Sequence, residues 1–364
     1  MQKMSLANLR PGMVVGRHIY GSDGRLLLNT GTVLTEAFIN RLKKNGLGSI
    51  YIKNSYLDDI EIPEIIQEET RKKAVSLMQK SFDDLKSTAS IKIEQFEQAA
   101  KSIVDEVITN RQALVHLTDI RTYDNYTFGH SVNVCILSTV TGLQLGYSKS
   151  KLQTLALGAL LHDVGKAFVP LEILNKPSHL TDDEMAVMRK HTETGFNVLR
   201  KQIEQIPLLA AHVAFQHHEK QNGSGYPRGL DGDHIHEFAK IVSIADVYDA
   251  VTADRPYRSC MPAHDAYELV VALSDIHFDP DILTTFLGNI ALYPIGSFIA
   301  LNSGEIGVVT NVISKLPTRP IVKVITDTDC KLLAQPYELD LTAELTIVVD
   351  SVLSEKDLVD LKLV

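Results

Sequence analysis

The sequence predicts a multidomain, mainly α-helical protein in which a long helical domain lies between two small β-rich modules. The chain has 364 residues, enough for two or three domains. Its apolar content of 45% is ordinary for packed globular cores. The hydrophobic pattern also changes twice along the chain, from short alternating runs to helical spacing and then to short β-branched runs.

Residues 1–60 are expected to form the N-terminal β-rich module. Between residues 9 and 53, short apolar runs alternate with turn residues. Thr35 is the expected N-cap of a short helix that stops near Gly46, and Ser49 to Ile52 has the pattern of a strand.

Residues 61–118 are predicted to be amphipathic linker helices. Apolar side chains recur at three- and four-residue steps among charges, at Val75, Met78, Phe82, Leu85, Phe96, Ala100, Ile103 and Val107. We expect this apolar face to pack on the next domain. A dimerising coil, and so a homodimer through these helices, is the alternative, although the pattern is short for a heptad repeat.

Residues 119–292 are the candidate catalytic domain, because they are mostly helical by pattern and hold nearly all the polar clusters. A small β-rich C-terminal module is predicted for residues 293–364, where β-branched residues and turn signals return. The expected strands are Phe298 to Leu301, Ile306 to Ile313, Ile321 to Ile325 and Leu345 to Val349.

Charge and cysteine content exclude several classes of protein. A net charge of -9 and a pI near 5.8 argue against a binder of nucleic-acid polymers or membrane surfaces. Cys135, Cys260 and Cys330 are few and far apart, so neither a disulfide framework nor a zinc ribbon is expected. No stretch approaches 18 apolar residues, and the N-terminus lacks a signal-peptide core. We expect a cytoplasmic protein without membrane insertion.

Of the 13 histidines, five are candidate metal ligands, together with two aspartates. They are His130, His162, His191, His217 and His218, accompanied by Asp163 and Asp246. Adjacent helical residues point about 100° apart, so His162 and Asp163 reach one site only beside a helix end, for which Gly165 is the expected cap. An aspartate that bridges two metal ions satisfies this geometry, and imidazole and carboxylate suit first-row transition metals.

This ordered set of residues resembles the HD superfamily of metal-dependent phosphohydrolases. The histidine pair is followed by a Gly-Tyr-Pro loop in His217-His-Glu-Lys-Gln-Asn-Gly-Ser-Gly-Tyr-Pro227. Further motifs are Gly229-Leu230, Ile244-Ala-Asp246, Tyr248-Asp-Ala250 and Arg255-Pro-Tyr-Arg258. Together they resemble the HD-GYP family of cyclic-di-GMP phosphodiesterases over roughly residues 120 to 292. The resemblance implies an all-helical HD-type catalytic domain with accessory modules on either side.

The resemblance also implies two divalent transition-metal ions, with iron or manganese expected first and zinc, cobalt or nickel also compatible. The implied ligands form two groups that share a bridging Asp163: His162 and Asp246 in one, and His191, His217 and His218 in the other. His130 would be a further ligand or a hydrogen-bonding partner of the site. Some relatives hold a third ion through a glutamate four residues before this histidine. Tyr126 stands there, which predicts a two-metal centre.

Asp163 and Lys166 are the expected catalytic residues, with Lys166 placing a positive charge near the phosphate or the leaving oxygen. The expected substrate contacts are Gly225, Tyr226, Pro227, Asp249, Arg255 and Arg258. A surface ion pair is the alternative for the two arginines. Asn222 stands where the family usually has Asp, a loss of charge that can weaken turnover.

The expected activity is hydrolysis of cyclic-di-GMP to linear pGpG, and slowly on to GMP, by in-line attack of a metal-bound hydroxide. One alternative is a cyclic-dinucleotide receptor or scaffold that binds without hydrolysis. The other is an HD hydrolase that acts on another cyclic dinucleotide or on a linear phosphate monoester. The complete ligand set counts against the first alternative, and the Gly-Tyr-Pro loop counts against the second.

Overall fold

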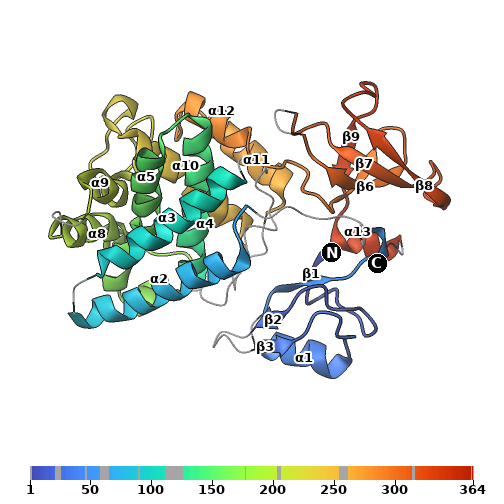
Figure 1. Ribbon diagram of the computed structural model, residues 1–364, viewed down its shortest axis with the longest axis horizontal. Coiled ribbons are helices and arrows are strands. Elements are labelled where there is room, and N and C mark those ends of the chain that lie inside the picture. The colour runs from blue at the N-terminus through green and yellow to red at the C-terminus, as the bar shows by residue number, and fades with distance from the viewer. Residues whose placement is uncertain are drawn as a thin grey trace.

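The computed structural model describes residues 2–20, 26–45, 47–57, 65–88, 91–110, 126–176, 178–202, 206–253, 261–313, 316–361 and 363. A large helical domain lies beside a C-terminal five-stranded sheet and a small N-terminal module (Figure 1). This arrangement confirms the predicted multidomain, mainly α fold. Within the described residues, no helix is long and apolar enough to cross a membrane.

The N-terminal module consists of two short antiparallel sheets and one helix. Strand β1 (Gln2–Ser5) pairs with β4 (Ser49–Ile52), and β2 (Ile19–Tyr20) pairs with β3 (Leu26–Leu28). Helix α1 (Glu36–Lys44) begins as predicted, because the Thr35 side chain accepts a hydrogen bond from the backbone N–H of Phe38. A one-turn 3-10 helix, η1 (Ser55–Leu57), follows β4.

The helical domain contains the candidate site. Its first two helices are α2 (Glu68–Thr88) and α3 (Ile93–Thr109). Among the described residues, the helices that follow are α4 (Tyr126–Gln144), α5 (Lys149–Leu161), η3 (Val164–Phe168), α6 (Leu171–Leu174), α7 (Asp182–Arg189), α8 (His191–Arg200), α9 (Leu208–Gln216), η4 (Gly232–His234), α10 (Glu237–Thr252), α11 (Ala263–Ala272) and α12 (Pro280–Leu287).

The predicted linker helices pack within this domain. The apolar side chains of α2 and α3 lie buried in the same hydrophobic core as those of α4, α5 and α10. Helix α3 lies against α4 and α5, and α2 lies against α3 and α4 (Figure 1). Because this face is covered within the chain, a homodimer would have to use another surface.

Helices α5 and α9 approach each other closely where the site is built. Gly158 of α5 faces Ala210 and Val213 of α9, and a methyl group at Gly158 would lie 2.8 Å from a Val213 methyl carbon. Nearly every residue of α5 from Leu155 onward is buried, so this helix runs through the middle of the domain. The end of α5 therefore delivers its last residues into the interior rather than to the surface.

Gly165 does not cap α5, which corrects the prediction for that residue. The helix ends at Leu161 with His162 as its C-cap, and Gly165 lies inside the following 3-10 helix η3. A Cβ atom at Gly165 would lie 1.9 Å from the carbonyl oxygen of His191. The glycine is required because η3 and α8 touch backbone to backbone, which brings His191 close to the end of α5.

The C-terminal module is an antiparallel sheet in the order β8-β7-β6-β5-β9. Its strands are β5 (Phe298–Leu301), β6 (Ile306–Asn311), β7 (Ile321–Thr326), β8 (Leu332–Asp340) and β9 (Val349–Val352). The first three lie where strands were predicted. The predicted strand at Leu345 to Val349 is wrong, because residues 345–348 lie outside any strand and β9 begins at Val349. Strand β8 and the short helix α13 (Glu355–Asp360) were not predicted.

The N-terminal and C-terminal modules contact each other through α13. The Glu355 carboxylate accepts hydrogen bonds from the backbone N–H and hydroxyl of Ser5 and from the Asn8 amide. Leu57 lies in one hydrophobic cluster with Phe298 and Leu358. The two ends of the chain thus meet beside the helical domain, as Figure 1 shows.

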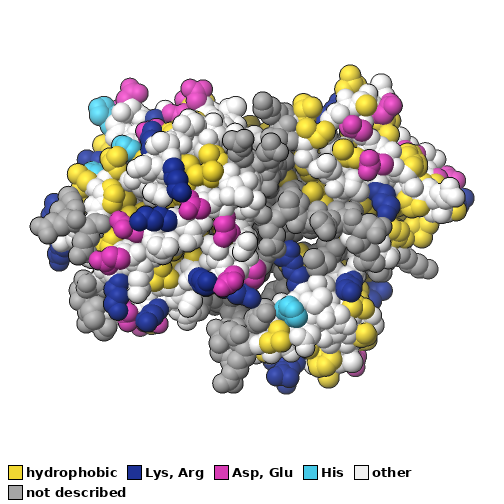
Figure 2. All heavy atoms as spheres, in the orientation of Figure 1, with side chains coloured by type: hydrophobic (Ala, Val, Ile, Leu, Met, Phe, Trp, Pro, Cys, Tyr) yellow, Lys and Arg dark blue, Asp and Glu magenta, His cyan; other side chains and the backbone are white. Residues whose placement is uncertain are grey.

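One face of the molecule shows no segregation of charge. Figure 2 shows lysine and arginine side chains interleaved with aspartates and glutamates over the helical domain. Hydrophobic side chains appear on the C-terminal module, where Leu332 and Tyr337 of β8 are exposed. On this face, the lysine and arginine side chains do not gather into a single basic patch.

Candidate metal centre and substrate loop

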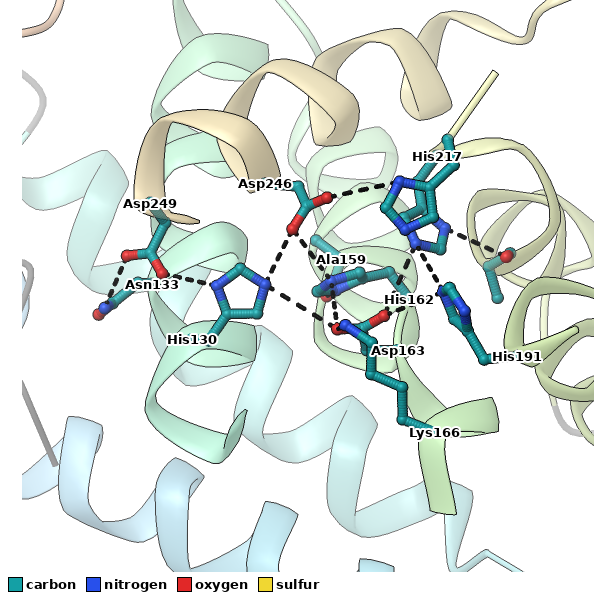
Figure 3. Close-up of polar contacts among 12 residues, drawn as sticks. His130, Asn133, Ala159, His162, Asp163, Lys166, His191, His217, Asp246 and Asp249 are labelled. Carbon is teal, nitrogen blue, oxygen red and sulfur yellow. Dashed lines mark hydrogen bonds and ion pairs between the residues drawn. The ribbon is translucent and has the colours of Figure 1, made fainter. Parts of the chain in front are cut away.

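The seven predicted ligands come from five helices and converge in the helical domain (Figure 3). They are His130 of α4, His162 and Asp163 between α5 and η3, His191 at the start of α8, His217 and His218 at the end of α9, and Asp246 of α10. Five of the seven lie at a helix end, where side chains point along as well as away from the helix axis. The structure therefore brings together every residue of the predicted set.

Asp163 lies at the centre of this cluster. Its Oδ1 atom is 3.4 Å from Nε2 of His191 and 3.7 Å from Nε2 of His217. Its Oδ2 atom is 3.3 Å from Nε2 of His162 and 3.9 Å from Nε2 of His130. The two oxygens of one carboxylate thus face two separate histidine groups, which is the geometry required of a bridging ligand.

Three imidazoles are held with one nitrogen toward this carboxylate. In His162 and His191, Nδ1 lies 2.7 Å from the carbonyl oxygen three residues earlier. In His217, Nδ1 lies 3.1 Å from two such carbonyl oxygens. A carbonyl only accepts, so each Nδ1 carries the proton and each Nε2 presents a lone pair to the site. This is how metal-binding histidines are usually oriented.

The arrangement fits divalent metal ions by three criteria. Within the described residues, Nε2 of His162 and Oδ1 of Asp163 are buried atoms without a hydrogen-bond partner, and buried polar atoms are otherwise almost always satisfied. Candidate ligand atoms also gather in two groups, and within each group they lie no more than 4.8 Å apart. One group is Asp163, His191, His217 and His218, and the other is His130, His162 and Asp163. Imidazole and carboxylate are also the donors that Mn, Fe, Co, Ni and Zn accept.

Burial and charge set the protonation states that a metal requires. Burial lowers the pKa of His191 to about 3, and it also holds the pKa of His218 well below its usual range. Burial alone would raise the pKa of Asp163, but the charge of Lys166 and the neighbouring His162 outweigh it, and the pKa falls well below normal. Near neutral pH these imidazoles are neutral and the carboxylate is ionised, as ligands must be.

Lys166 lies beside the predicted bridge. Its ammonium group forms an ion pair with Oδ2 of Asp163 and remains partly exposed, while the carboxylate is buried. One charged group of the centre thus reaches toward solvent. That position suits contact with an anionic ligand.

Asp249 differs from its predicted role as a substrate contact. It is fully buried, and its two oxygens lie 2.6 Å from Nδ1 of His130 and 2.9 Å from the Asn133 amide nitrogen. Nε2 of the same His130 lies 2.9 Å from Oδ1 of Asp246. Asp249 therefore orients His130 from inside the core, because its carboxylate is shielded from solvent and each of its oxygens already has a partner.

The Gly-Tyr-Pro loop is fixed by a glutamate that the sequence analysis did not single out. The buried Glu219 carboxylate accepts hydrogen bonds from the backbone N–H groups of Arg228, at 2.8 Å, and Leu230, at 2.9 Å. A helix end with two histidines and a glutamate offers a signal for this role, because an acidic side chain there suits the N–H groups of the loop that follows. Glu219 ties the far end of the loop to the histidine pair.

The Tyr226 ring lies over the His218 ring. The Tyr226 backbone N–H donates to the carbonyl oxygen of His218. The centroids of the Tyr226 and His218 rings lie 4.8 Å apart, and the ring planes meet at 31°. The guanidinium of Arg189 lies 5.2 Å from the centre of the same tyrosine ring. A tyrosine and an arginine thus border the metal side of the loop, and the arginine carries no sequence signal beyond its position two residues before His191.

Asn222 forms a local turn. Its side-chain oxygen accepts from the backbone N–H of Ser224, at 3.0 Å, and from the Ser224 hydroxyl, at 2.7 Å. A carboxylate would accept the same bonds more strongly.

We therefore expect Asn222→Asp to leave metal content unchanged and to raise kcat/KM about two- to fivefold, which corresponds to less than ~1 kcal/mol. Steady-state kinetics equal to wild type would make Asn222 a neutral replacement.

Three predicted features lie beyond what the structure describes. Arg255 and Arg258 fall outside the described residues, so their proposed phosphate contact stays a prediction. Tyr126 is the first residue of α4, but its side chain is not among those described.

Comparison with known proteins places these features in a family. The family model "HD domain" matches residues 97–282, about half of the chain. The chain belongs to the HD-domain family. This confirms the superfamily that the histidine and aspartate motifs indicated. A second model, "KOW domain associated with HD domain", matches residues 298–361 and so covers the C-terminal sheet and α13 of this HD-domain protein.

Similar proteins include a cyclic di-GMP phosphodiesterase of Pseudomonas aeruginosa, 38% identical over 62% of this chain and 55% of that protein. A 3'3'-cGAMP-specific phosphodiesterase of Vibrio cholerae is 36% identical over 46% of this chain and 36% of its own length. The chain thus spans about half or less of these relatives. The solved structure of an HDG"Y"P protein from Bdellovibrio bacteriovorus shares the fold, with a TM-score of 0.52 and 21% identity over 79% of this chain and 98% of that one.

Proposed function

We propose that this HD-domain protein is a metal-dependent phosphodiesterase that hydrolyses cyclic-di-GMP to linear pGpG and then, more slowly, to GMP. The observation that carries the proposal is the single carboxylate of Asp163, which faces two histidine groups with an unsatisfied oxygen. The similarity to cyclic-dinucleotide phosphodiesterases supports the substrate class. When bound, two divalent ions supply a nucleophile at neutral pH and neutralise charge on a phosphoryl group.

The chain's own residues hold and orient the substrate in this proposal. Lys166 places its ammonium group beside Asp163, where it meets a phosphate oxygen or the leaving oxygen. Tyr226 presents an aromatic ring above His218 for contact with a purine, and Glu219 keeps that ring in place through the loop backbone. Arg255 and Arg258 are proposed as further phosphate contacts.

Hydrolysis of a different cyclic dinucleotide is the second candidate. It is favoured by the similarity to a phosphodiesterase that is specific for 3'3'-cGAMP. Both substrates contain guanine and two phosphodiester bonds, so an aromatic ring beside a metal centre serves either. Selection between them would depend on contacts to the second base.

The proposal is tested by incubating the metal-reconstituted protein with cyclic-di-GMP, 3'3'-cGAMP and cyclic-di-AMP and identifying the products by mass. Conversion of cyclic-di-GMP to pGpG at the highest kcat/KM is expected. Preference for 3'3'-cGAMP would establish the second candidate. Tight binding of a dinucleotide with no product from any of the three would identify a receptor instead.

We expect two metal ions per chain at saturation, shared through Asp163. The ligand set exceeds what one four- to six-coordinate ion needs. Elemental analysis of the Mn²⁺- or Fe²⁺-loaded protein measures the ratio, and a value of one would contradict a bridged centre. Anomalous diffraction at the metal edge adds a second test, because a third full-occupancy peak beside His130 would contradict the prediction drawn from Tyr126.

A further inference from the structure

A chain of buried polar contacts connects α2 to the metal centre. Arg71 of α2 donates from Nη1 to the side-chain oxygen of Asn133, whose amide nitrogen donates to Oδ1 of Asp249 at 2.9 Å. Oδ2 of Asp249 lies 2.6 Å from Nδ1 of His130, and Nε2 of His130 lies 2.9 Å from Oδ1 of Asp246. Figure 3 shows the part of this chain from Asn133 to Asp246.

The members of the chain are shielded from water. Arg71 is 2% exposed, Asn133 is 3% exposed and Asp249 is fully buried. A buried charge is costly unless an opposite charge or hydrogen bonds compensate it. Here a guanidinium and a carboxylate lie on opposite sides of one amide group. Removing the guanidinium or the carboxylate would leave the other buried charge without the opposite charge across the amide.

Arg71 also determines which way the Asn133 amide points. A guanidinium only donates hydrogen bonds and a carboxylate only accepts them. The amide oxygen of Asn133 must therefore face Arg71, and its nitrogen must face Asp249. Without the arginine, the oxygen of Asn133 loses a charged donor, and only the contact with Asp249 holds the amide in this orientation.

The position of Arg71 is itself fixed. The Glu106 carboxylate of α3 accepts hydrogen bonds from the backbone N–H of Gln67 and from the Thr70 hydroxyl, at the start of α2. Helix α2 also packs against α4, which carries His130, and against η3, which carries Lys166. These contacts with α3, α4 and η3 fix the position of α2, and therefore the position of Arg71.

We infer that Arg71 is a positioning residue of the metal centre: acting through Asn133 and Asp249, it holds His130 against Asp246. This inference rests on the metal centre of the proposed function but not on the identity of the substrate. It assigns α2, the first helix after the N-terminal module, a role in shaping the centre. Displacement of α2 would alter the orientation of His130, which lies on α4, two helices later in the chain.

The inference is tested by measuring the Mn²⁺ affinity of the full chain by competition with a chelator. Arg71→Met removes the charge and the donor while keeping an unbranched side chain. Partners that orient a ligand typically contribute 10- to 100-fold to metal affinity, so we expect about tenfold weaker binding of at least one ion. Lys73→Met is the matched control, because Lys73 is on the same helix, is 75% exposed and pairs only with the equally exposed Glu69 among the contacts described.

A purely structural role for Arg71 gives a different result. It would lower the Tm of the metal-free protein but leave the Mn²⁺ affinity of the folded protein unchanged. Asn133→Leu provides an independent variant that interrupts the same chain at similar side-chain volume. If the chain acts as a unit, the double variant should bind Mn²⁺ about as weakly as either single variant, because interacting sites are not additive.

The outcomes separate this inference from the proposed function. Failure of the wild-type protein to bind Mn²⁺ would overturn the proposed metal centre and the inference with it. Unchanged affinity in both folded single variants, or fully additive losses in the double variant, would overturn the inference alone. If Arg71→Met does not fold, Asn133→Leu decides the matter, with weaker Mn²⁺ binding expected.

Discussion

Asp163→Ala is expected to abolish both metal binding and hydrolysis while leaving the protein folded. The carboxylate faces His191 and His217 with one oxygen and His162 with the other, so its loss removes a ligand from both groups at once. Metal ions contribute several kcal/mol of transition-state stabilisation, which corresponds to a loss of about 10³-fold or more in kcat. The fold should survive, because Lys166 retains access to water once its partner is removed.

Asp183→Ala is the matched control for this variant. Asp183 lies exposed in the first turn of α7, in the same domain, and its removal deletes a carboxylate of the same size. Metal content, kcat and the far-UV circular dichroism spectrum should be measured for both variants. Turnover near the wild-type level in Asp163→Ala would exclude a centre bridged by this residue, and loss of helical signal would show that the carboxylate supports folding.

The sequence suffices to find the candidate ligands that the structure brings together, because several of them stand in short, distinctive motifs. His162 and Asp163 are adjacent, as are His217 and His218, and each pair falls at a helix end. Geometry adds what spacing cannot. The close contact of Gly165 with the backbone of His191 brings α8 to the end of α5, and no local pattern distinguishes such a glycine from a helix cap.

The roles of Asp249 and Arg71 depend on tertiary contacts. Asp249 follows Asp246 by three residues, one turn along α10, which suggests a second polar group at the site surface. The structure shows instead that Asp249 faces His130 of α4 and lies in the core. Arg71 stands in a charge-rich helix where a buried arginine is indistinguishable from its exposed neighbours. Burial is decided by the packing of α2 on α4, which no local sequence pattern encodes.

Strand β8 was missed for a related reason. It is an edge strand of the C-terminal sheet, and most of its residues are exposed, so it lacks the apolar alternation of a strand with one buried face. Pro336 within it also argues against a strand, although proline is tolerated at sheet edges. The inner strands β5, β6 and β7 are richer in buried β-branched residues and were therefore visible.

Gly225→Ala in the Gly-Tyr-Pro loop is expected to cause a large loss of activity. A Cβ atom at Gly225 would lie 2.5 Å from both Cα of Glu219 and the backbone nitrogen of Lys220, and 2.6 Å from the carbonyl oxygen of His218. These are backbone atoms of the turn after α9, so the loop has to move away from it. Such a shift breaks the hydrogen bond from Tyr226 to His218 and carries the tyrosine ring off the metal centre.

We expect Gly225→Ala to lower kcat/KM about 100-fold, the typical cost of a displacement near 1 Å at a reacting centre, while metal content stays near that of wild type. Gly288→Ala is the matched control, because it adds the same methyl group to the same domain and its nearest contact, at 3.5 Å, is ordinary. The inhibition constant of a non-hydrolysable cyclic-di-GMP analogue should rise in parallel for Gly225→Ala and remain unchanged for Gly288→Ala. A methyl group at Gly225 would occupy the space between the loop and the turn after α9, so Tyr226 could not keep its place over His218. An inhibition constant equal to wild type in Gly225→Ala would therefore show that the loop does not touch the substrate.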